Sequence, residues 1–176
     1  MGLERFAASW RESYVADASA RERRGGNDAC VFCALSEMEP SSESGVLAFS
    51  ATSFVCLNAF PYGSGHLLVL PRRHLSELSA LSEAESADLF AMVRHASGAL
   101  ERAYGPDGMN VGLNLGRAAG AGLPTHLHAH VLPRWNGDTN FMSTIGETRV
   151  LPESLDATWA KVSANWSVPS QREPSQ

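Results

Sequence analysis

The sequence of 176 residues contains no apolar run near the ~20 residues that a membrane-spanning helix needs. Its first residues carry charges throughout, which is not the pattern of a secretory signal. Basic residues are also a minority, with 14 Lys and Arg against 19 Asp and Glu. A protein that coats the nucleic-acid backbone needs surplus positive charge on one face. These absences predict a cytoplasmic protein with neither a membrane nor a nucleic acid as its partner.

Cysteine is scarce too, and its distribution narrows the chemistry. The chain has three cysteines, an odd number, and two of them form the motif Cys30-Val31-Phe32-Cys33. In a chain without an export signal, this spacing favours a metal site or a redox pair over a disulfide framework. We expect the third, Cys56, to be a buried core residue. A metal site would require two further ligands.

Turn-forming and apolar segments predict one domain with flanking segments. The expected boundaries are an N-terminal arm over 1–28, the main domain over 29–150, a C-terminal helix over 151–166 and a disordered tail over 167–176. Short β-prone runs occupy residues 46–49, 54–58, 66–70, 109–115 and 126–132. A capping-box pattern at Ser82 starts a helix over 82–104 with apolar residues at helical spacing. Strands before and after one long helix predict an α+β fold with an antiparallel sheet of about five strands.

Histidine is sparse except at one place. The chain contains six, and three of them are His126, His128 and His130. Alternate residues on a strand project to one side, so three imidazoles would share a face opposite Leu127, Ala129 and Val131. Such a row can be a polar stripe, a metal site or a catalytic centre. In a catalytic centre, a neutral ring nitrogen attacks phosphorus while a neighbouring carbonyl or imidazole fixes the proton, and the central His128 is the natural nucleophile.

The segment HLHAHVL resembles the His-φ-His-φ-His-φ-φ signature of the histidine triad (HIT) family, where φ is an apolar residue. The likeness extends over roughly residues 28–150 and includes the segments CVFC, GHLLVLPRRH and NLGRAAGAG. It implies the α+β fold of that family, with one long helix and a shorter C-terminal helix. It also implies a nucleotide hydrolase or transferase in which His128 attacks the α-phosphate and forms a nucleotidyl-histidine. His126 and His130 would orient the nucleophile and assist the leaving group.

The same resemblance assigns a nucleotide pocket beside the triad. Phe32 would pack on the base, Asn58 would bond the ribose hydroxyls, and Asn114 would donate to phosphate. From the residues alone, Phe32 could equally be a core residue and Asn114 a turn cap. Gly120 and Gly122 lie in a glycine-rich loop whose backbone N–H groups can face phosphate oxygens. In the family a Ser or Gln commonly stands where this chain has Gly122, so the donor to the departing oxygen would differ here.

For the metal, the resemblance supplies the two missing ligands. In related proteins a CxxC pair joins two histidines around a structural zinc, and the matching positions here are His74 and His126. The implied zinc ligands are therefore Cys30, Cys33, His74 and His126, a set that suits tetrahedral coordination. His126 would then serve the metal and the triad at once. His66 and His95 have no assigned partner and are expected to be structural or surface positions.

Residues 134–141 resemble the branch of the family that includes bacterial diadenosine tetraphosphate (Ap4A) phosphorylases. The partner would be an adenine nucleotide or dinucleotide, and inorganic phosphate would resolve the intermediate to give ADP and ATP from Ap4A. Three alternatives stay open: an Ap4A hydrolase that uses water, an adenosine phosphoramidate hydrolase, and a non-catalytic nucleotide- or partner-binding module. The resemblance also implies a homodimer or a larger homo-oligomer.

Overall fold

The structure, a computed structural model, describes residues 30–138 and 153–167. The expected N-terminal arm over 1–28 and nearly all of the expected tail over 167–176 lie outside these ranges and stay predictions. Among the described helices, none combines the length and the apolar composition that crossing a bilayer requires.

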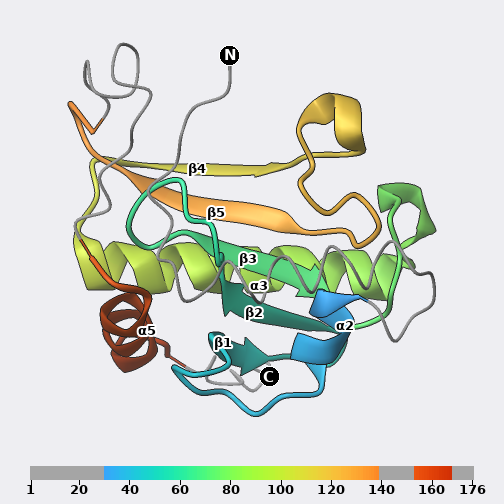
Figure 1. Ribbon diagram of the computed structural model, residues 1–176, viewed down its shortest axis with the longest axis horizontal. Helices are drawn as coiled ribbons and strands as arrows, with labels where there is room; N and C mark the ends of the chain where they lie inside the picture. The colour runs from blue at the N-terminus through green and yellow to red at the C-terminus, as the bar shows by residue number, and fades with distance from the viewer. Residues whose placement is uncertain (1–29, 139–152, 168–176) are drawn as a thin grey trace, which may run out of the picture.

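Five antiparallel strands in the described part of the chain form one sheet, in the spatial order β1-β2-β3-β5-β4 (Figure 1). They are β1 (Val46–Phe49), β2 (Ser53–Leu57), β3 (Leu67–Pro71), β4 (Gly108–Leu113) and β5 (Ala129–Arg134). Every residue of β2 and β3 is buried, as expected for strands rich in Val, Leu and Phe at the centre of a sheet. The sheet confirms the predicted α+β class and its antiparallel arrangement.

The long helix α3 (Glu83–Tyr104) begins and ends on signals that are present in the sequence. The Ser82 hydroxyl accepts a hydrogen bond from the Glu85 backbone N–H, and the Glu85 carboxylate accepts one from the Ser82 N–H. These two bonds complete the capping box. The helix ends at Gly105, whose φ of 53° lies in the left-handed region that glycine adopts at low cost. The predicted helix over 82–104 is confirmed.

Of the two shorter α-helices, one agrees with the prediction and the other was not predicted. α5 (Leu155–Ala164) lies within the predicted C-terminal helix and is capped by Ser154. The sequence gives no start signal for α2 (Val31–Ser36), which has neither a side-chain N-cap nor an acidic residue in its first turn. Two short 3-10 turns, η3 (Leu78–Ala80) and η4 (Arg117–Ala119), lie in connecting segments. The unpredicted α2 matters because it carries the CxxC motif.

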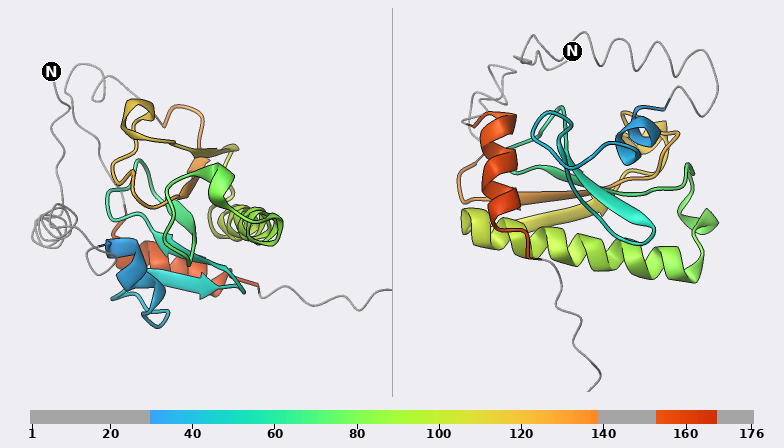
Figure 2. Two further views of the ribbon diagram at one scale, coloured as in Figure 1. Left: turned by 90° about the vertical axis from the view of Figure 1, so that its right-hand side faces the viewer. Right: turned by 90° about the horizontal axis from the view of Figure 1, so that it is seen from below.

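The helices α3 and α2 lie on opposite faces of the sheet (Figure 2). The larger apolar core lies between the sheet and α3. A second apolar cluster on the α2 face contains Phe32, Phe54 and Leu68. At the β1 edge, α5 packs against the sheet, and Trp159 Nε1 donates to the Val46 carbonyl oxygen at 2.8 Å. The sheet therefore separates a scaffold face from the face on which the site is built.

The predicted strand over 126–132 is wrong at its start, because β5 begins only at Ala129. Before that residue the backbone leaves the ladder with β3 and finds other partners. The Leu127 N–H donates to the Leu75 carbonyl oxygen at 2.7 Å, and Nε2 of His126 lies 2.9 Å from the Pro71 carbonyl oxygen. The alternation of faces continues through this segment, since Leu127 still packs in the core on the α3 side.

Candidate active site and metal centre

The three triad histidines line the face of the sheet opposite α3. The residues that alternate with them, Leu127, Ala129 and Val131, belong to the core on the α3 side. The shared histidine face predicted from the sequence is therefore confirmed. His126 and His128 are buried, and the ring centroids of His128 and His130 are 5.0 Å apart. The row is a packed cluster of imidazoles rather than a solvated polar stripe.

The backbone fixes the proton of His128. Its Nδ1 lies 2.8 Å from the His126 carbonyl oxygen, and a carbonyl oxygen only accepts hydrogen bonds. In the neutral ring Nδ1 therefore carries the proton, which leaves the lone pair on Nε2. Burial lowers the pKa of His128 below its ordinary value, so the neutral ring dominates at neutral pH. A neutral imidazole with its lone pair on Nε2 has the form that a nucleophile needs.

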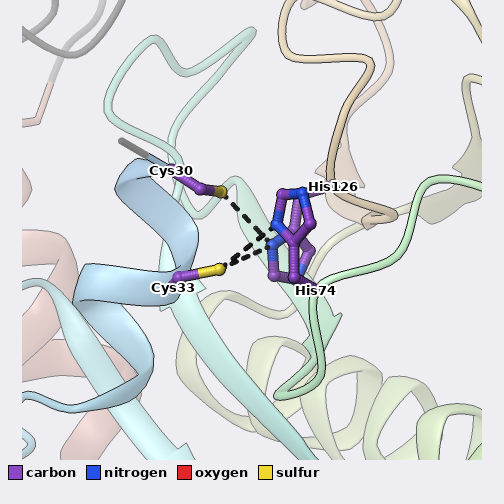
Figure 3. Close-up of side chains that lie close together, drawn as sticks. All are labelled: Cys30, Cys33, His74 and His126. Atoms are coloured by element: carbon purple, nitrogen blue, oxygen red, sulfur yellow. Dashed lines mark hydrogen bonds between the residues drawn. The ribbon is translucent and has the colours of Figure 1, made fainter. Parts of the chain in front are cut away.

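Four candidate metal ligands from separate segments converge on one point (Figure 3). Cys30 immediately precedes α2 and Cys33 lies within it, while His74 follows β3 and His126 precedes β5. Sγ of Cys33 is 3.2 Å from Nδ1 of His74, and Sγ of Cys30 is 3.4 Å from Nδ1 of His126. Tetrahedral zinc, with Zn–S of about 2.3 Å and Zn–N of about 2.0 Å, places sulfur and nitrogen ligands about 3.5 Å apart. The donor set fits this metal.

The surroundings of the cluster favour a metal over a redox pair. Nε2 of His126 donates to the Pro71 carbonyl oxygen, so the lone pair on Nδ1 faces the cysteines. Burial, reinforced by neighbouring Cys30, raises the pKa of Cys33 to about 12. A redox-active CxxC pair instead has a lowered thiol pKa. A bound cation would reverse the effect of burial by stabilising the thiolate, the form in which cysteine binds a metal.

His66 belongs to the site, although its position in the sequence assigns it no partner. It is 1% exposed, and its Nε2 lies 2.9 Å from Nδ1 of His130. Antiparallel pairing of β3 with β5 brings the start of β3 beside His130. The available signal was a histidine at the start of an otherwise apolar strand. The expectation of a merely structural or surface role for His66 is incomplete, because its ring directly contacts the triad.

Phe32 and Asn58, the predicted contacts to base and ribose, both lie beside the histidines. The Phe32 ring centroid is 5.3 Å from that of His128 and 5.6 Å from that of His126. Asn58 Oδ1 accepts from the Phe60 N–H at 2.9 Å, while its Nδ2 is 3.2 Å from Nδ1 of His66. The structure therefore places both residues near the triad, and their contacts with a nucleotide stay predictions.

The predicted phosphate-binding residues follow β4, which ends two residues earlier than expected. Asn114 Nδ2 lies 3.4 Å from Nε2 of His130, at the triad. The Gly120 N–H donates to the Arg117 carbonyl oxygen at 3.0 Å, and its φ of 91° explains the glycine. At Gly122 an added Cβ would meet no atom within 4 Å, so space alone does not require glycine there. The phosphate contacts of Asn114, Gly120 and Gly122 stay predictions.

Comparison with known proteins gives a consistent result. The HIT domain model matches residues 39–137. The AP-4-A phosphorylase of Mycobacterium tuberculosis (strain ATCC 25618 / H37Rv) is 38% identical over 168 residues, which cover 94% of this chain and 85% of that protein. The adenosine 5'-monophosphoramidase of Schizosaccharomyces pombe is 28% identical over 136 residues, or 77% of this chain and 97% of that protein.

A solved structure agrees with these matches. The zinc-bound histidine triad family protein from Mycobacterium smegmatis superposes with a TM-score of 0.64 at 28% identity, covering 80% of this chain and 95% of that one. The match to the HIT domain extends over more than half of the chain and includes the whole histidine row. The chain belongs to the histidine triad (HIT) family.

Proposed function

We propose that the protein transfers the adenylyl group of an adenine dinucleotide to inorganic phosphate, with His128 as the nucleophile. In the first step, Nε2 of His128 bonds to the α-phosphorus, and the bond to the bridging oxygen breaks with its electrons on the departing nucleotide. In the second step, an oxygen of inorganic phosphate displaces His128 from phosphorus. With Ap4A as substrate the products are ATP and ADP.

The proton arrangement of His128 carries this proposal. The hydrogen bond from its Nδ1 to the His126 carbonyl oxygen keeps the lone pair on Nε2, and burial keeps the ring neutral. The relative named AP-4-A phosphorylase supports the choice of substrate and acceptor, since its similarity covers nearly all of this chain. The relative named adenosine 5'-monophosphoramidase supports chemistry on an adenosine monophosphate group more broadly.

We also propose that Cys30, Cys33, His74 and His126 bind zinc. The distances between their donor atoms support this, as does the zinc-bound protein from Mycobacterium smegmatis with the same fold. With four ligands from the protein, the metal would have a structural role and no open position for substrate. His126 links the cluster to the chemistry, because its backbone carbonyl accepts the His128 hydrogen bond.

A homodimer remains part of the proposal. β4 is an outer strand of the sheet, and Val111 on it is 49% exposed. An exposed strand edge can pair with the same edge of a second copy and so join two sheets.

Mass measurement of the intact protein tests the nucleophile and the acceptor together. Wild-type protein mixed with Ap4A in phosphate-free buffer should gain the mass of one adenylyl group. Added phosphate should remove the adduct and release ADP. His128→Ala should form no adduct and should lose about four orders of magnitude or more in turnover, because no other group replaces a covalent nucleophile. His95→Ala, a partly exposed position on α3, is the matched control and should behave as wild type.

Other results would identify the alternatives. Release of AMP at the same rate with and without phosphate would indicate a hydrolase that uses water. A strong preference for adenosine phosphoramidates over Ap4A would indicate a phosphoramidate hydrolase. An adduct in His128→Ala would disprove the assignment of the nucleophile, and a lack of turnover with all these substrates would leave a nucleotide-binding module.

A further inference from the structure

Tyr62 lies against His66 and His130, at the end of the histidine row that is far from the cysteine–histidine cluster. It belongs to the turn between β2 and β3. Its ring centroid is 4.6 Å from that of His66 and 5.6 Å from that of His130, and its ring plane lies 25° from the His130 ring. Tyr62 is 40% exposed, whereas His66 is 1% exposed. The Tyr62 ring thus forms an outer wall between this pair of imidazoles and solvent.

The backbone of Tyr62 also fixes the protons of the pair. Its N–H donates to Nδ1 of His66 at 3.0 Å, and Asn58 Nδ2 approaches the same atom at 3.2 Å. Nδ1 of His66 is therefore an acceptor, and the proton of the neutral ring is on Nε2. That Nε2 lies 2.9 Å from Nδ1 of His130, which must accept in turn. Neutral His130 consequently carries its proton on Nε2.

Nε2 of His130 faces the residue expected to contact phosphate. Asn114 Nδ2 is 3.4 Å away. Both nitrogens carry hydrogen, so the pair is suited to share one oxygen acceptor rather than to bond to each other. Burial, with a smaller contribution from His128, lowers the pKa of His130 to about 4, so the ring is neutral at pH 7. At neutral pH His130 can thus donate a hydrogen bond to an anionic oxygen.

We propose that Tyr62 is a positioning residue that holds His130 where its Nε2–H stabilises the departing oxygen. The proposal rests on the assignment of His128 as the nucleophile. As Nε2 of His128 bonds to the α-phosphorus, the bond to the leaving group breaks and its electron pair stays on the departing oxygen. His130 donates a hydrogen bond to that oxygen and keeps its own proton, so the leaving group departs as an anion.

This role makes a prediction that simple packing does not make. Without the Tyr62 ring, water reaches His66 and His130, and the hydrogen bond to the departing oxygen weakens. The loss should be largest for leaving groups that stabilise negative charge poorly, because they depend most on that bond. A general loosening of the site would instead slow all substrates of the same size equally.

The experiment compares two AMP esters with leaving groups of similar shape and different basicity, the phenyl and the 4-nitrophenyl ester. Tyr62→Leu removes the ring, and Tyr62→Phe keeps it. Phe90→Leu, at a 50% exposed aromatic on α3, is the matched control. For Tyr62→Leu we expect kcat to fall roughly tenfold or more with the phenyl ester and less than about threefold with the 4-nitrophenyl ester, with little change in KM. Tyr62→Phe and Phe90→Leu should match wild type.

An equal loss with both esters, or no loss in Tyr62→Leu, would overturn the proposal. A nitrogen NMR measurement on wild-type protein tests the same arrangement even if Tyr62→Leu does not fold. The rings of His66 and His130 should each carry the proton on Nε2, and a proton on Nδ1 of either would overturn the proposal. If wild-type protein turns over neither the esters nor Ap4A, the proposed function itself fails, whatever the NMR result.

Discussion

His126 and His130 lie at opposite ends of one histidine row, and their ring nitrogens have different hydrogen-bond partners. Nδ1 of His126 faces the cysteine sulfurs, and its Nε2 donates to the Pro71 carbonyl oxygen. His130 is held at Nδ1 by His66, while its Nε2 faces Asn114 at the start of the glycine-rich loop. One histidine is therefore part of the scaffold, and the other presents a nitrogen to the site. The alternation of side chains along the strand decides which face each ring lies on, and the hydrogen-bond partners of the ring decide its role.

His128 lies between these ends and depends on each in a different way. It bonds to the backbone carbonyl of His126 at 2.8 Å, whereas it meets His130 through a ring contact at 5.0 Å. Substitutions in the proposed zinc site should therefore change both stability and the orientation of His128, the proposed nucleophile. Substitutions at the His130 end should mainly change how stability depends on pH and how the rate depends on the leaving group.

The largest effect on stability should follow the loss of a residue of the proposed zinc site. We expect Cys33→Ala to abolish metal binding and to lower the free energy of unfolding by roughly 3 kcal/mol or more, since α2 is then no longer tied to His74 and His126. Turnover should fall about tenfold as well, because His126 positions His128. Metal analysis, urea unfolding and kcat measure the three effects.

Cys56→Ala is the control for this change. Cys56 is buried in the cluster on the α2 face and is not one of the four converging ligands. Its replacement should lower the free energy of unfolding by about 1 kcal/mol through lost packing and should leave the metal content intact. Full metal content and wild-type stability in Cys33→Ala would contradict the metal site.

The scaffold was more predictable from the sequence than the site. α3 follows from the capping box at Ser82 and the left-handed Gly105, which are local signals. The start of β5 is set by bonds from Leu127 to Leu75 and from His126 to Pro71, residues far apart in the chain. No local pattern contains that information. The helix α2 is hidden for a related reason, because it lacks a side-chain cap and packs through Phe32 against two histidines.

Within the site too, contacts between residues far apart in the chain were the ones that the sequence did not reveal. The four residues of the proposed zinc site were expected by resemblance, and the structure brings them together. The resemblance assigned no partner to His66 or Tyr62, since their contacts arise from the antiparallel pairing of β3 with β5 and from a backbone N–H in a turn. A backbone donor can fix the proton of a histidine whatever side chain it belongs to, so residue types alone do not reveal it.

A smaller effect should appear at the His130 end as a dependence of stability on pH. Burial lowers the pKa of folded His130 to about 4, against 6.5 in the unfolded chain. Between these values the unfolded chain binds more protons, so the contribution of His130 to stability is complete above pH 6.5 and is lost as the pH falls towards 4. The shift corresponds to ~3 kcal/mol at most, and partial exposure of the ring reduces this to about 1–2 kcal/mol.

Urea unfolding at pH 7 and pH 4.5 measures this contribution. His130→Asn should lose about 1–2 kcal/mol less than wild type between the two values, because it lacks the titrating ring. His95→Asn, on α3 and outside the histidine row, is the control for the loss of one histidine. Equal losses in His130→Asn and wild type would show that burial does not hold His130 neutral.

The smallest change in stability is expected at Gly122, where an added Cβ meets no atom within 4 Å. Gly122→Ser should keep the free energy of unfolding within about 0.5 kcal/mol of wild type. Its hydroxyl would restore the side-chain donor common at this position in the family, so adduct formation from Ap4A should become severalfold faster. Gly122→Ala adds the Cβ alone and should leave the rate unchanged. If Gly122→Ser leaves the rate of adduct formation unchanged, the departing oxygen already receives enough hydrogen bonds from the His130 end of the row. A serine at position 122 would then add nothing to the stabilisation of that oxygen.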